Sequence, residues 1–242
     1  MKKITIIILV CAFTIAGYSQ KNSRSRMPML GEKAPKFTAQ STNGNLNFPD
    51  DYYGKWKILF SHPASFTPVC TSELLELAYL QDDFDKINTS LIILSTDGIN
   101  SHIEWVRSME SINYKDRGTV DIKYPVVSDV GYEISNKYGM IHPESSTTKD
   151  IRAVFIVDPD DKIRSILYYP LNVGRNIDEI MRTMLALQKV DKRDVLTPAN
   201  WQTGDDYLVK SPESIKEAEK LKSKNDSSMY SLAWYMWYKN VN

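Results

Sequence analysis

FSHPASFTPVCTSE, at residues 60–73, is the stretch that decides how the surrounding chain folds. It continues a short apolar run, WKILFSH at 56–62, whose composition and length are typical of a buried strand. Pro63 turns the chain, and a helix is then expected, because Thr67 can cap its start and Pro68 suits the first helical position. The stretch therefore predicts a strand, a tight turn and the start of a helix in direct succession.

The same alternation of strands and helices continues along the chain. Helical spacing of leucine and alanine extends the first helix to about residue 87, and a second apolar run, LIILST, follows at 91–96. The last two strands are separated by DPDD at 158–161, whose composition is typical of a hairpin turn. Further strands are expected at 125–127, 152–157 and 163–169, and further helices at 101–111, at 130–138 and from Asn176 through Leu187.

This order places parallel crossovers first and a hairpin last. It predicts a mixed central sheet covered by helices, which is an α/β architecture and the order of a thioredoxin-like fold with insertions. We expect this domain at residues 29–190. The pattern then breaks into a loop with Pro198, a charged helix at 214–222 and an aromatic end, YSLAWYMWY at 230–238. Residues 191–242 are therefore expected to form a small C-terminal subdomain that needs a partner surface.

Composition excludes several classes of protein. The 242 residues include 42% hydrophobic and 25% charged side chains, which is ordinary for a globular chain. Thirty basic residues balance thirty acidic ones, so there is no basic field to hold a nucleic acid. Two cysteines exclude a disulfide scaffold and a four-cysteine zinc site. Three scattered histidines do not suggest a metal site, and we expect His102 and His142 at the surface and no bound cofactor.

The N-terminus has the pattern of a secretory signal peptide. A Lys-Lys pair precedes an apolar run at 4–16, and small residues and a polar stretch follow. The run is short for a bilayer span, so we expect cleavage near residue 20, export to the periplasm or beyond the cell, and no stable membrane insertion. A retained anchor and lipid attachment at Cys11 remain alternatives. Cleavage would leave Cys70 as the single cysteine of the mature chain.

Cys70 lies in the first turn of the predicted helix. Unpaired backbone N–H groups and the positive helix end favour an anion there, so the thiol should ionise more easily. Thr67, three positions earlier, can place its hydroxyl near the sulfur or near an oxygen bound beside it, and Pro63 keeps one wall apolar. Such a thiolate can attack one oxygen of a hydroperoxide and become a sulfenic acid.

Charged side chains elsewhere could support this thiolate. Arg152, at the start of a predicted core strand, is the best candidate for a counter-charge, and Arg175 is a second choice. Glu73 either caps or decorates the helix surface or holds an arginine through a charge-assisted bond. His62 is either a structural histidine of the sheet or a supporting group beside Cys70.

Two other cysteine chemistries fit the sequence less well. A cysteine–histidine hydrolase would need a base near the thiol, and His62 could act as one, but no hydrolase signature surrounds it. A dithiol oxidoreductase needs a C-x-x-C motif, and residue 67 is threonine, which excludes that class.

The active-site stretch resembles that of a known family. Pro63-x-x-x-Thr67-x-x-Cys70 matches the peroxiredoxin pattern, and HPASFTPVCTSEL at 62–74 closely resembles the one-cysteine peroxiredoxins. The resemblance covers roughly residues 29–222. Further similar segments are LSTD at 94–97, RAVFI at 152–156, SILYYP at 165–170, GRNIDEI at 174–180 and TPANW at 197–201.

This resemblance implies a thioredoxin fold, a homodimer, and a thiol-dependent peroxidase that acts without metal or haem. It implies that hydrogen peroxide and small organic hydroperoxides are substrates, and it places Arg152 where the family keeps its active-site arginine. With no second thiol in the mature chain, an outside thiol must reduce the sulfenic acid, either a small molecule or a redox protein. The remaining alternative is a chaperone-like or redox-sensing scaffold that keeps the fold without turnover, but intact Thr67, Cys70 and Arg152 favour the enzyme.

Two segments depart from the family pattern. Some relatives carry a G-x-S-x-G-like element for phospholipase activity, but residues 51–57 read DYYGKWK, so we predict no lipase chemistry. The aromatic end at 230–238 also differs from the usual family ending.

Overall fold

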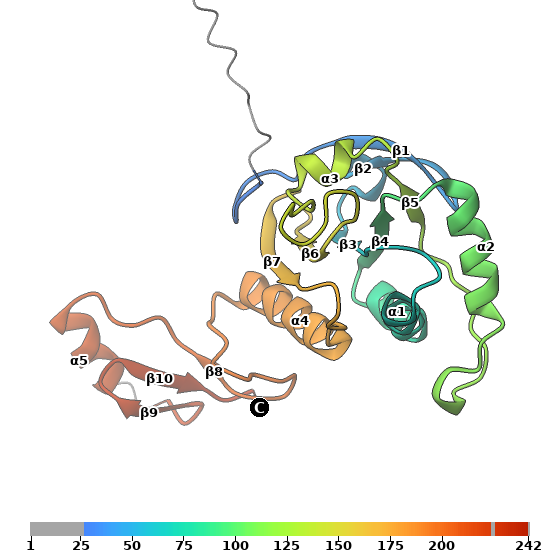
Figure 1. The fold of residues 1–242 in the computed structure, drawn as a ribbon. Coiled ribbons are helices and arrows are strands. Elements are labelled where there is room, and N and C mark those ends of the chain that lie inside the picture. The colour runs from blue at the N-terminus through green and yellow to red at the C-terminus, as the bar shows by residue number, and fades with distance from the viewer. Residues whose placement is uncertain (1–26, 224–225, 242) are drawn as a thin grey trace, which may run out of the picture.

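The computed structural model describes residues 27–223 and 226–241. The predicted signal peptide at 1–20, with Cys11, lies outside the described residues. Figure 1 shows a helix-covered sheet and a smaller C-terminal subdomain that extends away from helix α4 (Ile177–Arg193). No helix in the described ranges is long and apolar enough to cross a membrane.

The main sheet has seven strands in the order β2-β1-β5-β4-β3-β6-β7. Strand β3 is parallel to β4 and antiparallel to β6, so the sheet is mixed, as predicted. The N-terminal hairpin of β1 and β2 was not expected from the sequence, because its short strands, FTAQS and GNLNF, contain few apolar residues. The strand bounds are β1 Phe37–Ser41, β2 Gly44–Phe48, β3 Trp56–Ser61, β4 Thr89–Ser95, β5 Val126–Ser128, β6 Arg152–Val157 and β7 Ile163–Tyr169.

Helices cover the sheet on both faces. All six residues of β3 are buried, because successive side chains enter opposite layers. Ile58 and Phe60 pack in the core with residues of α1, α2 and α4, whereas Leu59 packs in the second core with α3 and the N-terminal hairpin. The remaining helices are α1 Pro68–Lys86, α2 Ile99–Glu110 and α3 Glu133–Lys137, with 3₁₀ turns at Asp50–Tyr52 and Tyr114–Asp116.

The helix expected at 130–138 is shorter than predicted and spans Glu133–Lys137. Tyr132 has a left-handed φ of 58° and therefore cannot belong to the helix. The Asp129 carboxylate accepts hydrogen bonds from the backbone N–H groups of Ile134 (3.2 Å) and Ser135 (2.7 Å), which fixes the helix start.

The C-terminal subdomain contains a second, three-stranded sheet in the order β8-β10-β9. The aromatic end of the chain forms its hairpin, in which the rings of Tyr230 and Tyr238 stack at 5.0 Å. Buried Trp201 and Tyr207 pack with Ala186 of α4 and so attach the subdomain to the main domain. The domain boundary at 190/191 remains a prediction. The elements are β8 Tyr207–Leu208, α5 Ile215–Ser223, β9 Met229–Ala233 and β10 Met236–Lys239.

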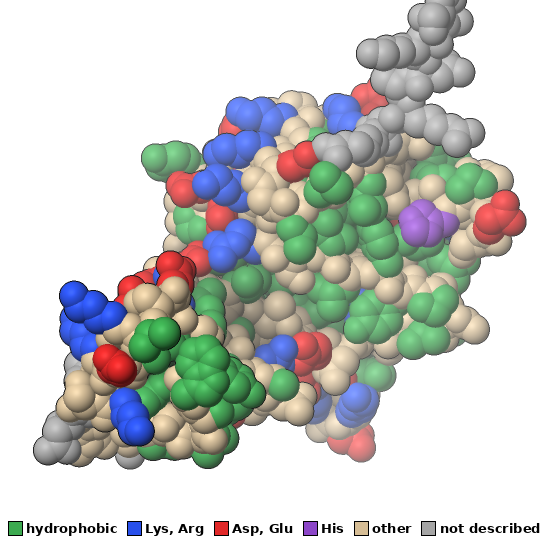
Figure 2. All heavy atoms as spheres, turned by 90° about the vertical axis from the view of Figure 1, so that its left-hand side faces the viewer, with side chains coloured by type: hydrophobic (Ala, Val, Ile, Leu, Met, Phe, Trp, Pro, Cys, Tyr) green, Lys and Arg blue, Asp and Glu red, His purple; other side chains and the backbone are tan. Residues whose placement is uncertain are grey.

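Large apolar side chains lie exposed on this subdomain (Figure 2). They include Ile215 on α5, Leu232 on β9, and the pair Trp234 and Tyr235 in the turn between β9 and β10. Contiguous apolar surface of this kind is typical of an interaction site.

Candidate active site

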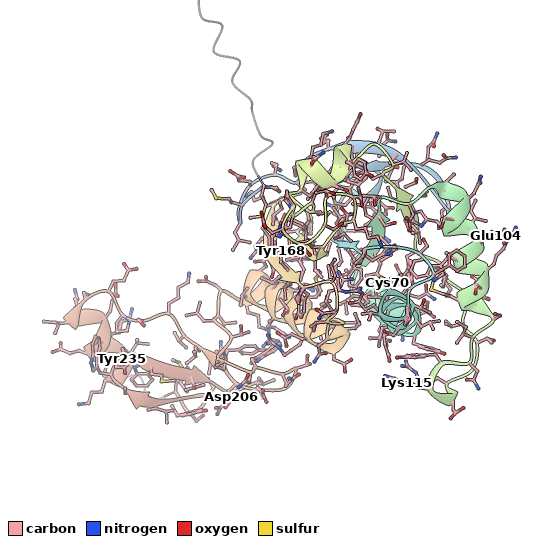
Figure 3. The ribbon with its side chains drawn as sticks, in the orientation of Figure 1. Cys70, Glu104, Lys115, Tyr168, Asp206 and Tyr235 are labelled. Carbon is pink, nitrogen blue, oxygen red and sulfur yellow. The ribbon has the colours of Figure 1, made fainter. Side chains whose placement is uncertain are left out.

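Cys70 is the third residue of α1 and is fully buried. A short loop leads to it from β3. Thr67 occupies the expected N-cap position with extended backbone angles, but its side chain makes no capping hydrogen bond. Phe66, directly before Thr67, has a left-handed φ of 56° that turns the chain into the helix. Figure 3 labels Cys70 at the start of α1, well away from Tyr235 of the C-terminal subdomain.

Arg152 contacts the thiol directly. Its Nη1 lies 3.3 Å from Cys70 Sγ and 2.7 Å from Glu73 Oε2. Nε and Nη2 both donate to the carbonyl oxygen of Leu171, at 2.9 and 2.7 Å, so the guanidinium has one fixed orientation. Arg152 is 2% exposed and is therefore not a solvated surface charge.

Glu73 joins both candidate arginines. It is buried one helical turn after Cys70, and therefore is not the surface or capping residue that we considered as an alternative. Its Oε1 accepts from the backbone N–H and Nε of Arg175, at 2.8 and 2.9 Å, and its Oε2 accepts from Arg175 Nη2 at 2.8 Å. Glu73 thus acts as the shared acceptor for Arg152 and Arg175.

Arg175 is held by backbone as well as by Glu73. Its Nη1 donates to the carbonyl oxygens of Ser61 and Ala153, at 2.8 and 2.9 Å, and its guanidinium lies 3.2 Å from the centre of the Phe60 ring. Burial lowers the pKa of Arg175, and the hydrogen bonds to Glu73 oppose this effect. Two arginines and one glutamate leave one positive charge in excess, which a thiolate at Cys70 would balance.

Of the two positions predicted for the Thr67 hydroxyl, beside the sulfur or beside an oxygen bound there, the structure shows no bond to the sulfur. The hydroxyl donates to the carbonyl oxygen of Ala64 at 2.9 Å, because the loop folds back on itself there. Its oxygen lone pairs can still accept a hydrogen bond from a bound peroxide. Pro63 is buried in the same loop.

His62 is fully buried behind this loop, next to the indole ring of Trp105 at 4.9 Å. Neither ring nitrogen has a hydrogen-bond partner among the described residues, so His62 and Cys70 do not form the pair that a cysteine–histidine hydrolase needs. Burial lowers the pKa of His62 well below its usual value, and His102 and Arg175 lower it further. His62 is therefore neutral at neutral pH.

The expectation that His102 lies at the surface is wrong. His102 is 0% exposed, because it shares the buried face of α2 with Trp105 and Met109. His142 is exposed, as expected. Among the described residues, no group of three or more acidic, histidine or cysteine side chains is arranged to hold a metal ion.

Two further residues contact the active-site loop and were not expected from the sequence. Ser65 donates its backbone N–H to Asp97 at 2.5 Å, and its hydroxyl lies 3.0 Å from Nδ1 of His102. Asp97 lies within the LSTD segment, but nothing local marks it as a partner of residue 65. The spacing of His102, Trp105 and Met109 on one helix face is a signal that could have indicated the burial of His102.

Comparison with known proteins agrees with this geometry. The model of the AhpC/TSA family matches residues 30–166. This chain belongs to the AhpC/TSA family. A second model, the C-terminal domain of 1-Cys peroxiredoxin, matches residues 186–222 of this peroxiredoxin. The protein is accordingly a thiol-dependent peroxidase with a thioredoxin-like fold.

Two similar peroxiredoxins match this chain over nearly the whole of their own length. Peroxiredoxin of Methanosarcina mazei is 49% identical over 214 residues, which is 88% of this chain and 98% of the relative. Peroxiredoxin of Thermotoga petrophila is 46% identical, over 89% of this chain and 99% of the relative.

Solved structures with similar folds include two peroxiredoxins. The yeast mitochondrial 1-Cys peroxiredoxin has a TM-score of 0.75 and 36% identity, covering 88% of this chain and 99% of that one. A cysteine-to-serine mutant of peroxiredoxin 6 of Arenicola marina has a TM-score of 0.76 and 37% identity, covering 88% and 98%.

Proposed function

We propose that Cys70 is the nucleophile of this peroxidase and that its substrates are hydrogen peroxide and small organic hydroperoxides. The observation that carries the proposal is the 3.3 Å contact between Cys70 Sγ and Nη1 of the buried Arg152. A guanidinium at this distance stabilises the thiolate and the charge that develops on the peroxide oxygens.

The reaction begins with attack of the Cys70 thiolate on one oxygen of the hydroperoxide. A sulfur–oxygen bond forms, the O–O bond breaks, and the leaving oxygen takes up a proton to become an alcohol, or water in the case of hydrogen peroxide. Cys70 is left as a sulfenic acid. The thiol has been oxidised by two electrons and the peroxide reduced by the same two.

The other site residues have supporting roles in this proposal. Arg152 orients the peroxide and stabilises the departing oxygen, and the Thr67 hydroxyl accepts a hydrogen bond from the peroxide. Glu73 and Arg175 fix the orientation of Arg152 through the charged hydrogen bonds they share. Pro63 excludes water from one wall of the site. His62 has a packing role beneath the loop rather than a role in proton transfer.

An external thiol completes the cycle. It attacks the sulfenic acid to form a mixed disulfide and water. A second external thiol then attacks the outer sulfur of this mixed disulfide, which forms a disulfide between the two external thiols and releases the Cys70 thiol. Cys70 is the only cysteine among the described residues, so that part of the chain offers no internal partner. The yeast relative has a thiol-resolving mechanism via glutathione/thioredoxin systems, and a reductant of that class is our proposal here.

Export and a homodimer also belong to the proposal. The N-terminal pattern supports export, and the mature chain should begin near residue 20 and be found outside the cytoplasm. Family membership and the exposed aromatic turn at Trp234 and Tyr235 support a homodimer. N-terminal sequencing of the secreted protein and light scattering of the purified protein test the two points separately.

The test of the function is a single turnover. Reduced protein is mixed with one equivalent of hydrogen peroxide, and both peroxide loss and the mass of the Cys70 peptide are followed. We expect one peroxide consumed per chain, a mass gain of one oxygen atom, and labelling of Cys70 by a sulfenic-acid trap. The Cys70→Ser variant should consume none. No peroxide loss in the wild type, or quantitative conversion to a disulfide dimer without trap labelling, would overturn the mechanism.

A further inference from the structure

Ser61, the last residue of β3, lies where the pairing between β3 and β6 ends. The two strands are neighbours in the sheet (Figure 1), and their antiparallel register stops at the pair Phe60 and Val154. Ser61 and Ala153 come next on the two strands, and both are 0% exposed. Buried backbone groups at this point need hydrogen-bond partners other than those of the regular ladder.

The Ser61 hydroxyl supplies these hydrogen bonds. It donates to the carbonyl oxygen of Ile151 at 2.7 Å and accepts the backbone N–H of Ala153 at 3.0 Å. The same N–H also lies 3.1 Å from the Ile151 carbonyl oxygen, because the chain makes a three-residue turn centred on Arg152. The hydroxyl therefore binds both of the backbone groups that close the turn.

The two edges of β6 are held differently at this turn. On one edge Arg152 is paired with Tyr169 in the backbone register of β6 and β7. On the edge toward β3, a side chain replaces the backbone ladder. A ladder bond is independent of residue type, whereas this connection needs a group that can donate and accept at once, as a hydroxyl does.

The turn matters because it determines where the Arg152 side chain begins. The far end of that side chain is held by the Leu171 carbonyl oxygen, and Nη1 lies 3.3 Å from Cys70 Sγ. Such a contact weakens steeply with distance and angle. A turn that loosens at Arg152 therefore weakens the contact with the sulfur.

The backbone of Ser61 holds the other arginine of the site. Its carbonyl oxygen accepts Arg175 Nη1 at 2.8 Å, and the Ala153 carbonyl oxygen accepts the same atom at 2.9 Å. These acceptors belong to the main chain, so replacement of the Ser61 side chain leaves them in place. Ser61→Ala thus removes a support of Arg152 and no direct partner of Arg175.

We propose that Ser61 is a positioning residue of the peroxidase, whose hydroxyl holds the turn centred on Arg152 and so keeps Nη1 beside Cys70 Sγ. The proposal rests on the function assigned to Cys70 above. The effect of Ser61 on the thiol passes through Arg152, and this dependence separates a positioning role from a general contribution to stability.

The variants are Ser61→Ala, which removes the hydroxyl and little volume, and a matched control, Ser41→Ala. The buried Ser41 hydroxyl likewise donates to one carbonyl oxygen, that of Gly44 at 2.7 Å, and accepts one backbone N–H, that of Asn43 at 3.2 Å. It lies in the N-terminal hairpin. Both variants are also prepared in combination with Arg152→Ala, which gives a double-mutant cycle.

Three quantities are measured. They are the single-turnover rate with hydrogen peroxide, the ultraviolet absorbance of the Cys70 thiolate at neutral pH, taken as the difference from Cys70→Ser, and hydrogen exchange of the Ala153 amide. We expect Ser61→Ala to slow peroxide attack about threefold to tenfold, as loss of one hydrogen bond implies, to lower the thiolate absorbance and to speed exchange at Ala153. Ser41→Ala should change none of the three.

The combined variants decide whether Ser61 acts through Arg152. With Arg152→Ala already present, Ser61→Ala should change the remaining rate by less than about twofold. Equal rates in Ser61→Ala and wild type, or the same slowing by Ser61→Ala with and without Arg152, would overturn the proposal. If the wild type consumes no peroxide, the function of Cys70 fails instead, and thiolate absorbance and amide exchange still decide the role of Ser61.

Discussion

The chain buries ionisable groups in two neighbouring regions. The groups keep their charge in one region and are neutral in the other. In the active site, Glu73 accepts hydrogen bonds from two arginines, and each arginine also binds backbone carbonyls. Two residues before Arg152, the carboxyl group of Asp150 is 0% exposed, and neither of its oxygens has a hydrogen-bond partner among the described residues. Buried charge is maintained in the first region by pairing, whereas in the second region it is avoided by protonation.

The pKa of Asp150 reflects this difference. Burial raises it to about 8, and nearby Asp129 and Asp97 act in the same direction. The comparison shows that position in the core does not decide the charge of a buried acid. The groups that face its oxygens decide it.

Removing the shared acceptor should have the largest effect. Glu73→Ala leaves two buried guanidinium groups with no carboxylate, and breaking a buried ion pair in this way costs about 3–5 kcal/mol. We expect the free energy of unfolding in urea to fall by that amount at pH 7. In Glu73→Gln, which keeps the shape and one acceptor, the free energy of unfolding should fall by less. Equal losses in the two variants would show that packing, not charge, is what Glu73 supplies.

Loss of Arg152, which lies beside the Cys70 sulfur, should have the second-largest effect. Arg152→Ala should slow single-turnover peroxide attack by about 10²- to 10³-fold, the usual effect of removing one donor to a developing negative charge. Arg152→Lys restores the charge without the two-pronged hydrogen bonding and should recover only part of the rate. A rate within about threefold of wild type in Arg152→Ala, which corresponds to about 0.6 kcal/mol, would mean that the site stabilises its charge by other means.

Replacement of Asp150 should have a smaller effect, and this replacement should stabilise the fold. Its folded-state pKa lies above its unfolded value, so the folded state holds a proton that the unfolded state has lost, and stability falls as pH rises from about 4 to about 8. Asp150→Asn cannot ionise and should be more stable than wild type by about 1–3 kcal/mol at pH 8. Urea unfolding at pH 4.5 and pH 8 measures the change, and a gain that is the same at both pH values would contradict the assignment.

The smallest effect should come from His62, the other buried group without a hydrogen-bond partner among the described residues. Its folded-state pKa is lowered, so the unfolded state binds a proton first, and stability is lost as pH falls below about 6.5. His62→Phe removes this dependence. Wild type should lose about 1 kcal/mol more than His62→Phe between pH 7 and pH 5.5. Parallel pH profiles would show that His62 has the same pKa in the folded and the unfolded chain, so that burial does not lower it.

Local patterns predicted the framework of the fold well. The six-residue apolar strand β3 and the Pro63, Thr67 and Pro68 signals define the start of α1 because these effects act within a few residues. The hairpins β1–β2 and β9–β10 were missed for a different reason. The strands of the first are short and contain few apolar residues, and the turn of the second, at Trp234 and Tyr235, lacks glycine, asparagine and proline.

The active site was predicted only in part, because only some of its residues belong to a local motif. Cys70 and Thr67 stand in one local motif, and the family resemblance indicated Arg152. The convergence of Arg152 and Arg175 on Glu73 depends on β6 lying beside β3, which no short segment encodes. The burial of Asp150 likewise follows from tertiary packing alone, because a single aspartate before a strand is indistinguishable from a solvated one.

The carbonyl groups that hold the two arginines have a consequence for how this enzyme tolerates change during evolution. Leu171, Ser61 and Ala153 contribute main-chain oxygens, which every amino acid provides. Replacement of a side chain at position 171 therefore leaves the acceptor of Arg152 in place. An insertion or deletion between β7 and α4 would instead move a different carbonyl into that position. Position 171 is therefore free to vary in residue type, whereas the segment around it, which also carries Arg175, is constrained in length.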